Sequence, residues 1–350
     1  MHLAAIGWKF VKKTGSRELR YQSPSGQIFR SLAKVCVHVL RHHHQDLEPD
    51  EKLKTDEEPP YPIDHDSNHA FEYACSFCYA TEGKVVLCSR CVLPFHPACI
   101  VFEVESDQWT YPSCVCLVCS RREDVSQTFT CDYCQRHVHI KCKETLLPAN
   151  DMVCSRTCQI SLSNLIGICG RSYRLEDERL SWGLWKFTGG TENMDEETYK
   201  KLKQASSLMK ICFSGITHPW PPNFLDDIIF GNSSTNDNLK GFYTALLEKE
   251  DKAATVVILK VHGSTLVEFP FVGTKPSYRN KGLCKLLLEQ FEHQLRDIGV
   301  KKIVLPVLPS KVTTWGSLGL KKMTDLERKM LLQYKLVEFV GSIRCHKLLM

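Results

Sequence analysis

Hydrophobic positions are patterned most regularly in the last 150 residues of the chain. Apolar side chains recur at helical spacing over 197–213 and over 285–298, so that one face of each segment is apolar. Runs rich in β-branched and aromatic residues predict four strands, at 241–248, 254–261, 265–272 and 302–307. This part of the chain is therefore expected to form one domain of mixed helices and strands.

The first 45 residues show a second, shorter pattern. Two strand-like runs flank the turn signal Ser23-Pro24-Ser25-Gly26, and apolar residues follow at helical spacing over 31–42. Eight Lys or Arg against one Glu give residues 1–45 a net charge of +7. Such a segment can meet a phosphate backbone, and a basic solvated face is the alternative. Residues 46–69 are acidic and proline-rich, which predicts a solvated linker.

With Gly7-Trp8 at its start, the order strand, turn, strand, helix resembles a methyl-CpG-binding domain. The resemblance implies DNA contact through Arg30, because a bidentate arginine on guanine is the commonest specific base contact. Glu18 and Arg20 stand where that family has Asp and Tyr, so segment 1–45 is a degenerate version of the pattern.

Cysteines are concentrated in one block. Thirteen of the 18 lie between Cys75 and Cys158, where a Cys-x-x-Cys pair followed four residues later by His-x-x-Cys occurs twice. The N-terminal sequence lacks a secretory pattern, and no apolar run approaches the ~18 residues of a membrane span. We therefore expect a reducing compartment, no membrane partner and thiols that bind metal, since zinc takes four thiolate or imidazole ligands.

This repeat resembles tandem PHD fingers, whose ligands are shared between two zinc ions in cross-braced order. The resemblance implies fingers at 70–115 and 116–160, a connector at 161–200, and three or four zinc ions. It groups the ligands into four sets: Cys75, Cys78, His96 and Cys99; Cys88, Cys91 and Cys114; Cys116, Cys119, His139 and Cys142; and Cys131, Cys134, Cys154 and Cys158.

One of the sixteen ligand positions is not filled. Tyr111 stands two residues after Trp109, where the family has a cysteine. Three explanations stay open: three protein ligands completed by water or Tyr111, which we favour; Cys116 and Cys119 serving the first finger instead; or an empty inner site.

PHD fingers commonly bind the N-terminal tail of a histone by adding it as a strand. The resemblance therefore implies the histone 3 tail as a partner, pairing with 84–87, alongside other chromatin proteins. Glu72 and Glu82 favour an unmodified lysine in that tail. A purely structural finger is the alternative.

A second motif lies between the strand at 265–272 and the helix at 285–298. Arg279-x-x-Gly282-x-Cys284 places a glycine loop at a helix N-terminus, where unpaired amides favour an anion. It resembles the acyl-CoA loop of GNAT acetyltransferases, although Cys284 stands where they have Gly or Ala. The resemblance implies a GNAT domain at 201–350, an α+β fold with a mixed, mostly antiparallel sheet, and acetyl-CoA as cosubstrate. The implied contact residues are Phe271, Val272, Gly273, Arg279, Asn280, Lys281, Gly282, Leu283 and Cys284.

Glu268 stands eleven residues before Arg279. Histone acetyltransferases of this superfamily carry their general base at that separation, so the resemblance implies this role for Glu268. A lysine ammonium, with a pKa near ~10.4, must lose a proton before it attacks a thioester. An exposed charge at a strand edge is the alternative. The segment 311–319 has no tyrosine to protonate the leaving thiolate, and we assign no acid.

PHD fingers ahead of a GNAT domain resemble the plant nuclear acetyltransferases of the increased-DNA-methylation type. The resemblance implies a nuclear histone lysine acetyltransferase that reads a histone tail and regulates transcription. A catalytically inactive chromatin reader is the alternative, because Tyr111, Cys284 and the missing tyrosine depart from the family patterns.

Overall fold

The computed structural model describes 9–12, 19–22, 28–29, 75–80, 82–88, 93–100, 109–121, 127–144, 147, 151–188, 195–214, 223–231, 241–339 and 341–349. Arg30, Glu72, Cys91, the helix expected at 31–42 and the linker expected at 46–69 lie outside these residues. None of the helices described is long and apolar enough to cross a bilayer.

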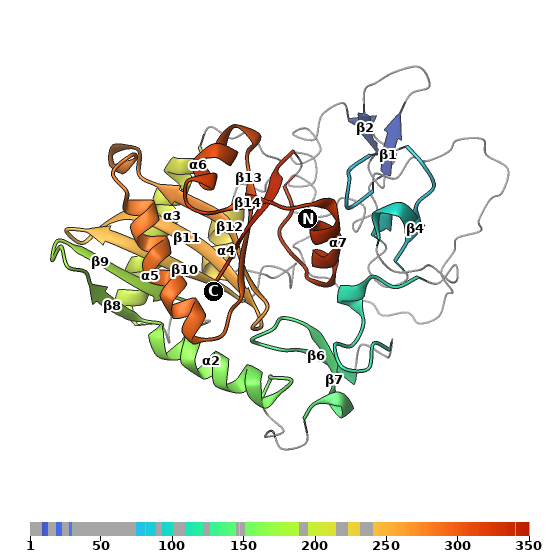
Figure 1. Ribbon diagram of the computed structural model, residues 1–350, viewed down its shortest axis with the longest axis horizontal. Helices are drawn as coiled ribbons and strands as arrows, with labels where there is room; N and C mark the ends of the chain where they lie inside the picture. Colours follow the sequence, from blue (N-terminus) through green and yellow to red (C-terminus); the bar gives the residue numbers. More distant parts are fainter. Residues whose placement is uncertain are drawn as a thin grey trace, which may run out of the picture.

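One eight-stranded sheet dominates the molecule (Figure 1). Its strands run in the order β14-β15-β13-β12-β11-β10-β9-β8. All neighbours are antiparallel except β12 and β13, which are parallel and are joined through helix α5. The predicted mixed, mostly antiparallel sheet is therefore confirmed. The strands are β8 (Arg171–Arg174), β9 (Leu180–Trp185), β10 (Phe242–Lys249), β11 (Lys252–His262), β12 (Leu266–Thr274), β13 (Lys302–Val307), β14 (Lys321–Lys322) and β15 (Ile343–Leu348).

Helices cover both faces of the sheet. On one face, α3 (Glu196–Phe213) and α4 (Phe224–Phe230) bury an apolar cluster against the strands. On the other face, α5 (Leu283–Asp297) and α2 (Arg156–Ile168) contribute to a larger core. The two helices predicted from apolar periodicity are thus present as α3 and α5. Asp195 caps α3 by accepting the amide hydrogen of Thr198, which explains why the helix begins there.

The sheet starts earlier in the chain than the sequence indicated. Strands β8 and β9 lie inside 161–200, which was expected to be a connector, so that expectation is corrected. Trp182 contributes to the core beneath α5 and Trp185 to the core beneath α3. A strand buried on both faces shows no polar alternation, which is why β9 was missed. At Gly183 a Cβ would lie 2.6 Å from the Arg171 carbonyl oxygen, so glycine permits the close approach of β8.

The N-terminal segment contains a three-stranded antiparallel sheet. Strands β1 (Lys9–Lys12), β2 (Leu19–Gln22) and β3 (Ile28–Phe29) lie in that order. Gln22 pairs with Ile28, so the chain reverses between β2 and β3 where the turn was predicted.

Each cysteine-rich finger contains a two-stranded ribbon. In the first finger β4 (Val86–Leu87) pairs with β5 (Pro94–Phe95), and in the second β6 (Thr128–Thr130) pairs with β7 (His137–His139). Short helices fill the rest of the fold: η2 (Pro97–Cys99), η3 (Pro112–Cys114), η5 (Ile140–Cys142), η7 (Pro276–Tyr278), η8 (Pro309–Lys311) and α6 (Val312–Gly316).

A long connection joins β14 to β15 and lies between the sheet and the fingers (Figure 1). It contains α7 (Asp325–Met330) and η9 (Leu331–Gln333). Thr324 and Glu327 form a capping box that fixes the start of α7. Residues 324–339 are called the strap below.

Candidate functional site

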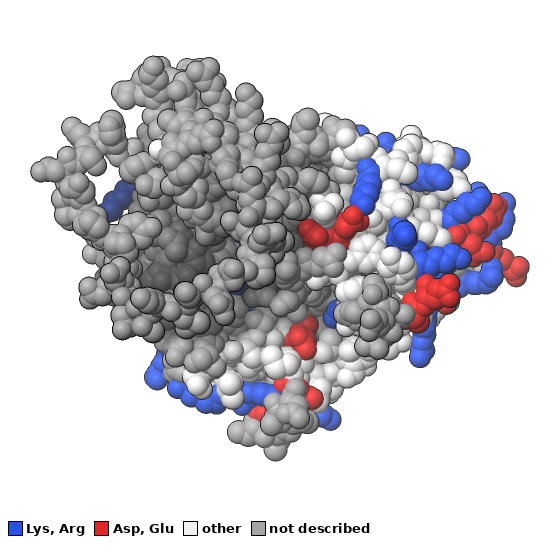
Figure 2. Space-filling view, turned by 180° about the vertical axis from the view of Figure 1, so that it is seen from behind, with Lys and Arg blue, Asp and Glu red and all other residues white. Residues whose placement is uncertain are grey.

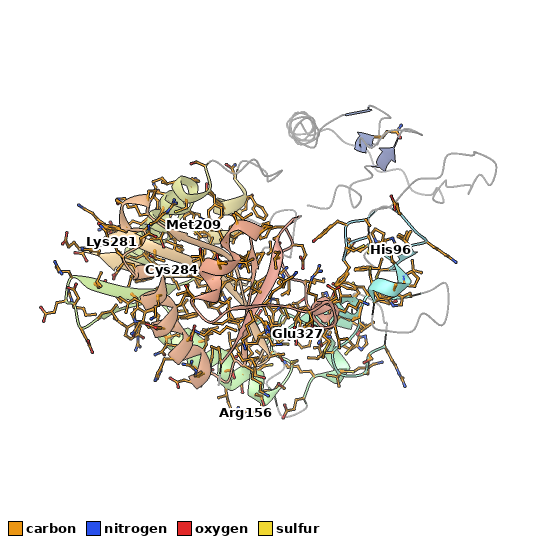
Figure 3. All side chains as sticks on the ribbon, turned by 45° about the horizontal axis from the view of Figure 1, so that its top comes forward. His96, Arg156, Met209, Lys281, Cys284 and Glu327 are labelled. Atoms are coloured by element: carbon orange, nitrogen blue, oxygen red, sulfur yellow. The ribbon has the colours of Figure 1, made fainter. Side chains whose placement is uncertain are left out.

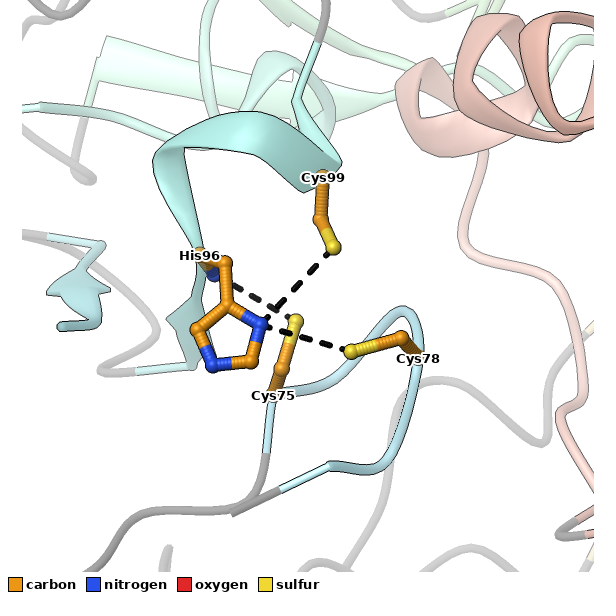
Figure 4. A group of neighbouring side chains, drawn as sticks. All are labelled: Cys75, Cys78, His96 and Cys99. Carbon is orange, nitrogen blue, oxygen red and sulfur yellow. Dashed lines mark hydrogen bonds between the residues drawn. The ribbon is translucent and has the colours of Figure 1, made fainter. Parts of the chain in front are cut away.

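The first finger gathers Cys75, Cys78, His96 and Cys99 around one point (Figure 4). Their ligand atoms all lie within 4.8 Å of one another, and Nδ1 of His96 lies 3.4 Å from Sγ of Cys78 and 3.8 Å from Sγ of Cys99. Bonds of the usual Zn–S length place tetrahedral ligand atoms roughly 3.7 Å apart. The arrangement therefore fits a zinc ion held by three sulfurs and one ring nitrogen.

Backbone amides near Cys75 lower the pKa of its thiol. Burial acts to raise the pKa of the Cys75 thiol, but hydrogen bonds from the backbone amides of Cys78, His96 and Phe77 lower it overall. The amides of Phe77 and His96 lie 3.5 Å and 3.3 Å from Sγ of Cys75. They favour the thiolate, which is the form that binds metal.

The second finger holds two such groups. Cys116, Cys119, His139 and Cys142 form the first, with Nδ1 of His139 3.3 Å from Sγ of Cys119. Cys131, Cys134, Cys154 and Cys158 form the second, and all four are buried. Because Cys116 and Cys119 lie with His139 and Cys142, they are not available to the first finger. That explanation for the unfilled ligand position is therefore excluded.

Tyr111 lies in an aromatic cluster of the first finger. Its ring stacks on Phe95 with centroids 5.0 Å apart, and Trp109 packs edge-on against Phe95 at 5.4 Å. The backbone amide of Tyr111 donates a hydrogen bond to Sγ of Cys88 at 3.1 Å. The aromatic side chain thus packs in the core of the finger at the position where PHD fingers have a thiolate.

Strands β12 and β13 separate beyond Glu268. Only Val267 with Ile303 and Glu268 with Val304 are paired. From Phe269 onward, the described residues of β13 no longer pair with β12. This splay between β12 and β13 lies before the glycine loop, and it brings backbone groups of β12 within reach of a ligand.

The loop after β12 presents an open helix N-terminus. Asn280 and Gly282 have φ values of 60° and 77°, and Gly282 directly precedes α5 without a side-chain cap. A Cβ at Gly282 would meet no atom within 4 Å, so there is open space beside this glycine. Uncapped amides at the start of a fifteen-residue helix, with that open space, fit a phosphate group.

Positive charge gathers beside this loop. The ammonium groups of Lys249, Lys275 and Lys281 lie 5.9, 5.7 and 5.7 Å from the ring centre of Tyr278. In the space-filling view, this end of the sheet carries charges of both signs (Figure 2). The lysines near Tyr278 therefore provide a local anion-binding environment within a mixed surface.

Cys284 has the character of a small core residue. Burial raises the pKa of its thiol to about 11, and it packs against the core beneath α5. A neutral, compact side chain lets the helix approach the sheet, as Gly or Ala does in the family pattern. Arg279 donates from Nε to the carbonyl oxygen of Thr274 at 3.1 Å, so it braces the loop.

Glu268 lies fully buried where the splay begins. Its Oε1 accepts the backbone N–H of Val337 at 2.6 Å and lies 3.6 Å from Nη1 of Arg344, and its Oε2 lies 3.6 Å from Nε2 of His262. Burial lowers the pKa of His262, which favours the neutral ring, and lowers the pKa of Lys260 to about 8. The alternative of an exposed strand-edge charge is excluded by this burial.

Sequence reasoning did not find Arg344, His262 or the strap as neighbours of Glu268. They come from β15, β11 and the β14–β15 connection, and no motif links them to β12. The loop and the first finger lie apart: Lys281 and Cys284 are on one side of the molecule, His96 is on the other, and Glu327 of the strap lies between (Figure 3).

Comparison with known proteins places these features in a family. Residues 213–348 match the family described as Increased DNA methylation 1, C-terminal domain, and residues 1–43 match a domain of unknown function, DUF7028. DNA contact through Arg30 therefore remains a prediction.

Two curated relatives and one solved structure are similar to parts of the chain. Increased DNA methylation 1 of Arabidopsis thaliana is 30% identical over 301 residues, which cover 79% of this chain and 25% of that protein. Zinc finger protein DPF3 of Danio rerio is 27% identical over 146 residues, covering 34% of this chain and 37% of that protein. The structure of Tetrahymena GCN5 aligns with a TM-score of 0.38 and 9% identity, covering 46% of this chain and 93% of its own. The chain spans a quarter of the length of the Arabidopsis relative. The chain is thus an Increased DNA methylation 1-type protein in the parts that match: it carries that C-terminal domain over 213–348, behind two cysteine-rich fingers.

Proposed function

We propose that the protein is a nuclear histone lysine acetyltransferase that uses acetyl-CoA and reads a histone tail through its first finger. The proposal rests on the positions of two features. Glu268 lies where β12 and β13 begin to separate, and the loop at 279–284 lies beyond the end of β12, at the start of α5. The carboxylate at one end can accept a proton from an amine, and the helix N-terminus at the other can hold the pyrophosphate of an acyl-CoA.

Acetyl-CoA would supply an activated acetyl thioester. The backbone amides from Asn280 to Cys284 would hold its pyrophosphate, with Lys249, Lys275 and Lys281 adding positive charge. The edge of β12 that faces away from β11, at Phe271–Gly273, would hydrogen-bond the thioester arm. Gly273 has a further role, because a Cβ there would lie 2.8 Å from Sδ of Met209 and 3.1 Å from Sγ of Cys212, so glycine lets α3 pack behind the strand.

Glu268 would accept the proton of the incoming lysine ammonium. The guanidinium of Arg344 and the ring of His262 lie beside this carboxylate, each 3.6 Å from one of its oxygens. The carboxylate currently accepts the amide of Val337, so the strap must release it before a substrate can reach it.

The cysteine groups would hold zinc and give the fingers their shape. Three complete sets of four ligands fit three ions, and Cys88 with Cys114 are the described residues that would contribute to a fourth. In the first finger the exposed β4 strand, with Leu87 37% exposed, offers an edge for a histone 3 tail. Glu82 near that edge favours an unmodified lysine.

A catalytically inactive reader is the second candidate. Glu268 is closed off by the strap, and α6, at Val312–Gly316, carries no tyrosine to protonate a thiolate. Its fingers would then bind chromatin without acetyl transfer.

One assay separates the two candidates. Purified protein is incubated with labelled acetyl-CoA and core histones beside Glu268→Gln, with Glu289→Gln, a half-exposed charge on α5, as the matched control. We expect Glu268→Gln to transfer label about 100-fold more slowly or worse, since a positioned base contributes at least about that factor. The control should keep the wild-type rate. Absence of transfer by the wild type favours the inactive reader, whereas an active wild type with an equal rate for Glu268→Gln would contradict the role of Glu268 as the base.

Metal content tests the finger assignment separately. Native mass spectrometry should detect three or four zinc ions per chain, three of them in the complete ligand sets. A folded chain without zinc would contradict this assignment.

A further inference from the structure

The strap is fastened to the first finger by several specific contacts. Arg328 donates from Nη2 to the carbonyl oxygen of Phe77 at 3.1 Å, and its guanidinium lies 4.5 Å from the centre of the Phe77 ring. Lys329 donates to the carbonyl oxygen of Ala98 at 2.5 Å. Leu332 is buried in the apolar cluster of the finger itself. The strap can therefore change its position relative to the first finger only by breaking these contacts.

The second finger contacts the same strap. Arg136 donates from Nη1 to Oε1 of Gln333 at 3.3 Å and lies over the ring of Tyr334 at 5.8 Å. Nζ of Lys335 lies 2.9 Å from Nε2 of His137. Both fingers thus contact the part of the strap that precedes Val337.

A continuous path of polar contacts leads from the first finger to the candidate base. The hydroxyl of Tyr79 donates to Oε2 of Glu338 at 3.3 Å. Oε1 of Glu338 lies 2.6 Å from Nη2 of Arg344, and Nη1 of Arg344 lies 3.6 Å from Glu268. Arg344 also donates to the carbonyl oxygen of Val337 at 2.9 Å, so the path and the strap are one network.

The closed arrangement is incompletely hydrogen-bonded at its centre. Oε2 of Glu268, Nη1 of Arg344 and Nε2 of His262 are buried without a hydrogen-bond partner among the described residues, although they form the ion pairs given above. Such groups favour any state that lets them find partners. The closed state therefore depends on contacts elsewhere, and the finger contacts are the candidates.

We propose that the strap is an autoinhibitory lock, held by the first finger over Glu268, so that loosening the finger contacts uncovers the base. The inference rests on the proposed acetyl transfer for its catalytic consequence, but the lock itself is a property of the fold. The strap lies between the finger and the sheet and is the route by which the finger reaches Glu268 (Figure 3).

Hydrogen exchange measured by mass spectrometry on the zinc-loaded full chain tests the lock directly. Arg328→Ala removes the guanidinium that contacts Phe77, and Tyr79→Phe removes only one hydroxyl. Each variant should speed amide exchange over 334–339 by about five- to tenfold, the size expected from losing one hydrogen bond. Exchange over β13 should stay unchanged, which shows that the sheet is intact.

Two matched variants control for nonspecific effects. Leu326→Ala changes a 62% exposed side chain on the same helix as Arg328, and Tyr199→Phe removes a hydroxyl on α3 that is remote from the strap. Both should exchange like the wild type over 334–339. If Arg328→Ala and Tyr79→Phe also match the wild type, the lock is disproved.

Acetyl transfer is then measured on the same proteins. If the wild type is active, Arg328→Ala and Tyr79→Phe should transfer acetyl faster, in parallel with their exchange. An active protein whose exchange rises while its transfer rate does not would overturn the gating of Glu268. If no protein transfers acetyl, the proposed function fails, and the exchange comparison alone decides whether the finger holds the strap.

Discussion

The two fingers of this protein have similar ligand spacing and different relations to the C-terminal domain that contains the eight-stranded sheet. The second finger shares one apolar core with the sheet: Val138 and Tyr133 lie in the same cluster as Phe291 of α5. The first finger has its own small cluster, to which only Leu332 of the strap contributes from outside the finger among the described residues.

This difference indicates a division of labour. A finger whose core is continuous with the sheet acts as part of the domain, because neither can expose the shared surface without cost. A finger joined through a strap can detach while the domain stays folded. The second finger is therefore an integral part of the domain, whereas the first has a core of its own and is joined to the domain through the strap.

The largest effect should follow from breaking the second finger. Cys131→Ser removes a buried ligand from a group that packs on the sheet, so metal and shared core are lost together. Loss of a metal site is among the few changes that cost about 4 kcal/mol or more. Chemical denaturation should show the whole C-terminal domain destabilised, whereas Cys169→Ser, outside every ligand set, should cost far less. A domain that kept wild-type stability in Cys131→Ser would contradict the shared core.

The two fingers can also be compared by destabilising the sheet itself, through a substitution on α3. Nζ of Lys201 lies 2.7 Å from Glu248, and both side chains are buried. Lys201→Met leaves the carboxylate unpaired and should cost about 3 kcal/mol. In hydrogen exchange, the second finger should lose protection together with the sheet, and the first finger should not.

Lys210→Met is the matched control on the same helix. Lys210 pairs with Asp226 at the surface, with its side chain 52% exposed, so its loss should cost less than about 1 kcal/mol. Loss of protection in both fingers at once would show that they are equally integrated.

A smaller effect is expected from a single hydrogen bond at the junction. The hydroxyl of Tyr133 donates to the carbonyl oxygen of Ile298 at 3.4 Å, which links the second finger to the end of α5. Tyr133→Phe keeps the packing and removes this bond. It should lower the free energy of unfolding, measured by chemical denaturation, by about 1 kcal/mol. If Tyr133→Phe lost as much free energy of unfolding as Cys131→Ser, this hydrogen bond, and not the shared apolar core, would be the main link between the second finger and the domain.

The smallest effect on the C-terminal domain should come from the first finger. Cys78 is an exposed ligand, and Cys78→Ser should release its zinc. The stability of the sheet should change by less than about 0.5 kcal/mol, as for a surface substitution. Zinc content and domain stability are measured on one sample, and a drop comparable to that of Cys131→Ser would remove the distinction between the fingers.

Local patterns in the sequence were sufficient for much of this architecture. β-branched runs located β10 to β13, apolar periodicity located α3 and α5, and the Cys-x-x-Cys spacing grouped the ligands that the structure brings together. These features depend on residues close in sequence. β9 was missed because burial on both faces removes alternation.

The strap was missed for a different reason. Its helices are short, and its partners Phe77, Arg136 and Glu268 come from three separate parts of the chain. Contacts of this kind depend on how elements pack, and no spacing rule encodes them. The same is true of Arg344 beside Glu268, where the motif identified the carboxylate but not its counter-ion.

The hydrogen bond from Tyr133 to Ile298 also has a consequence for biosynthesis. The two residues are 165 positions apart, so at typical translation speeds the finger leaves the ribosome roughly ten to thirty seconds before its partner. During that interval the zinc ligands can be metallated, but the apolar face around Val138 has no sheet to cover it. A nascent chain of this protein therefore exposes the apolar face of its second finger until the sheet is synthesised. Binding of chaperones during synthesis should be greatest at that stage.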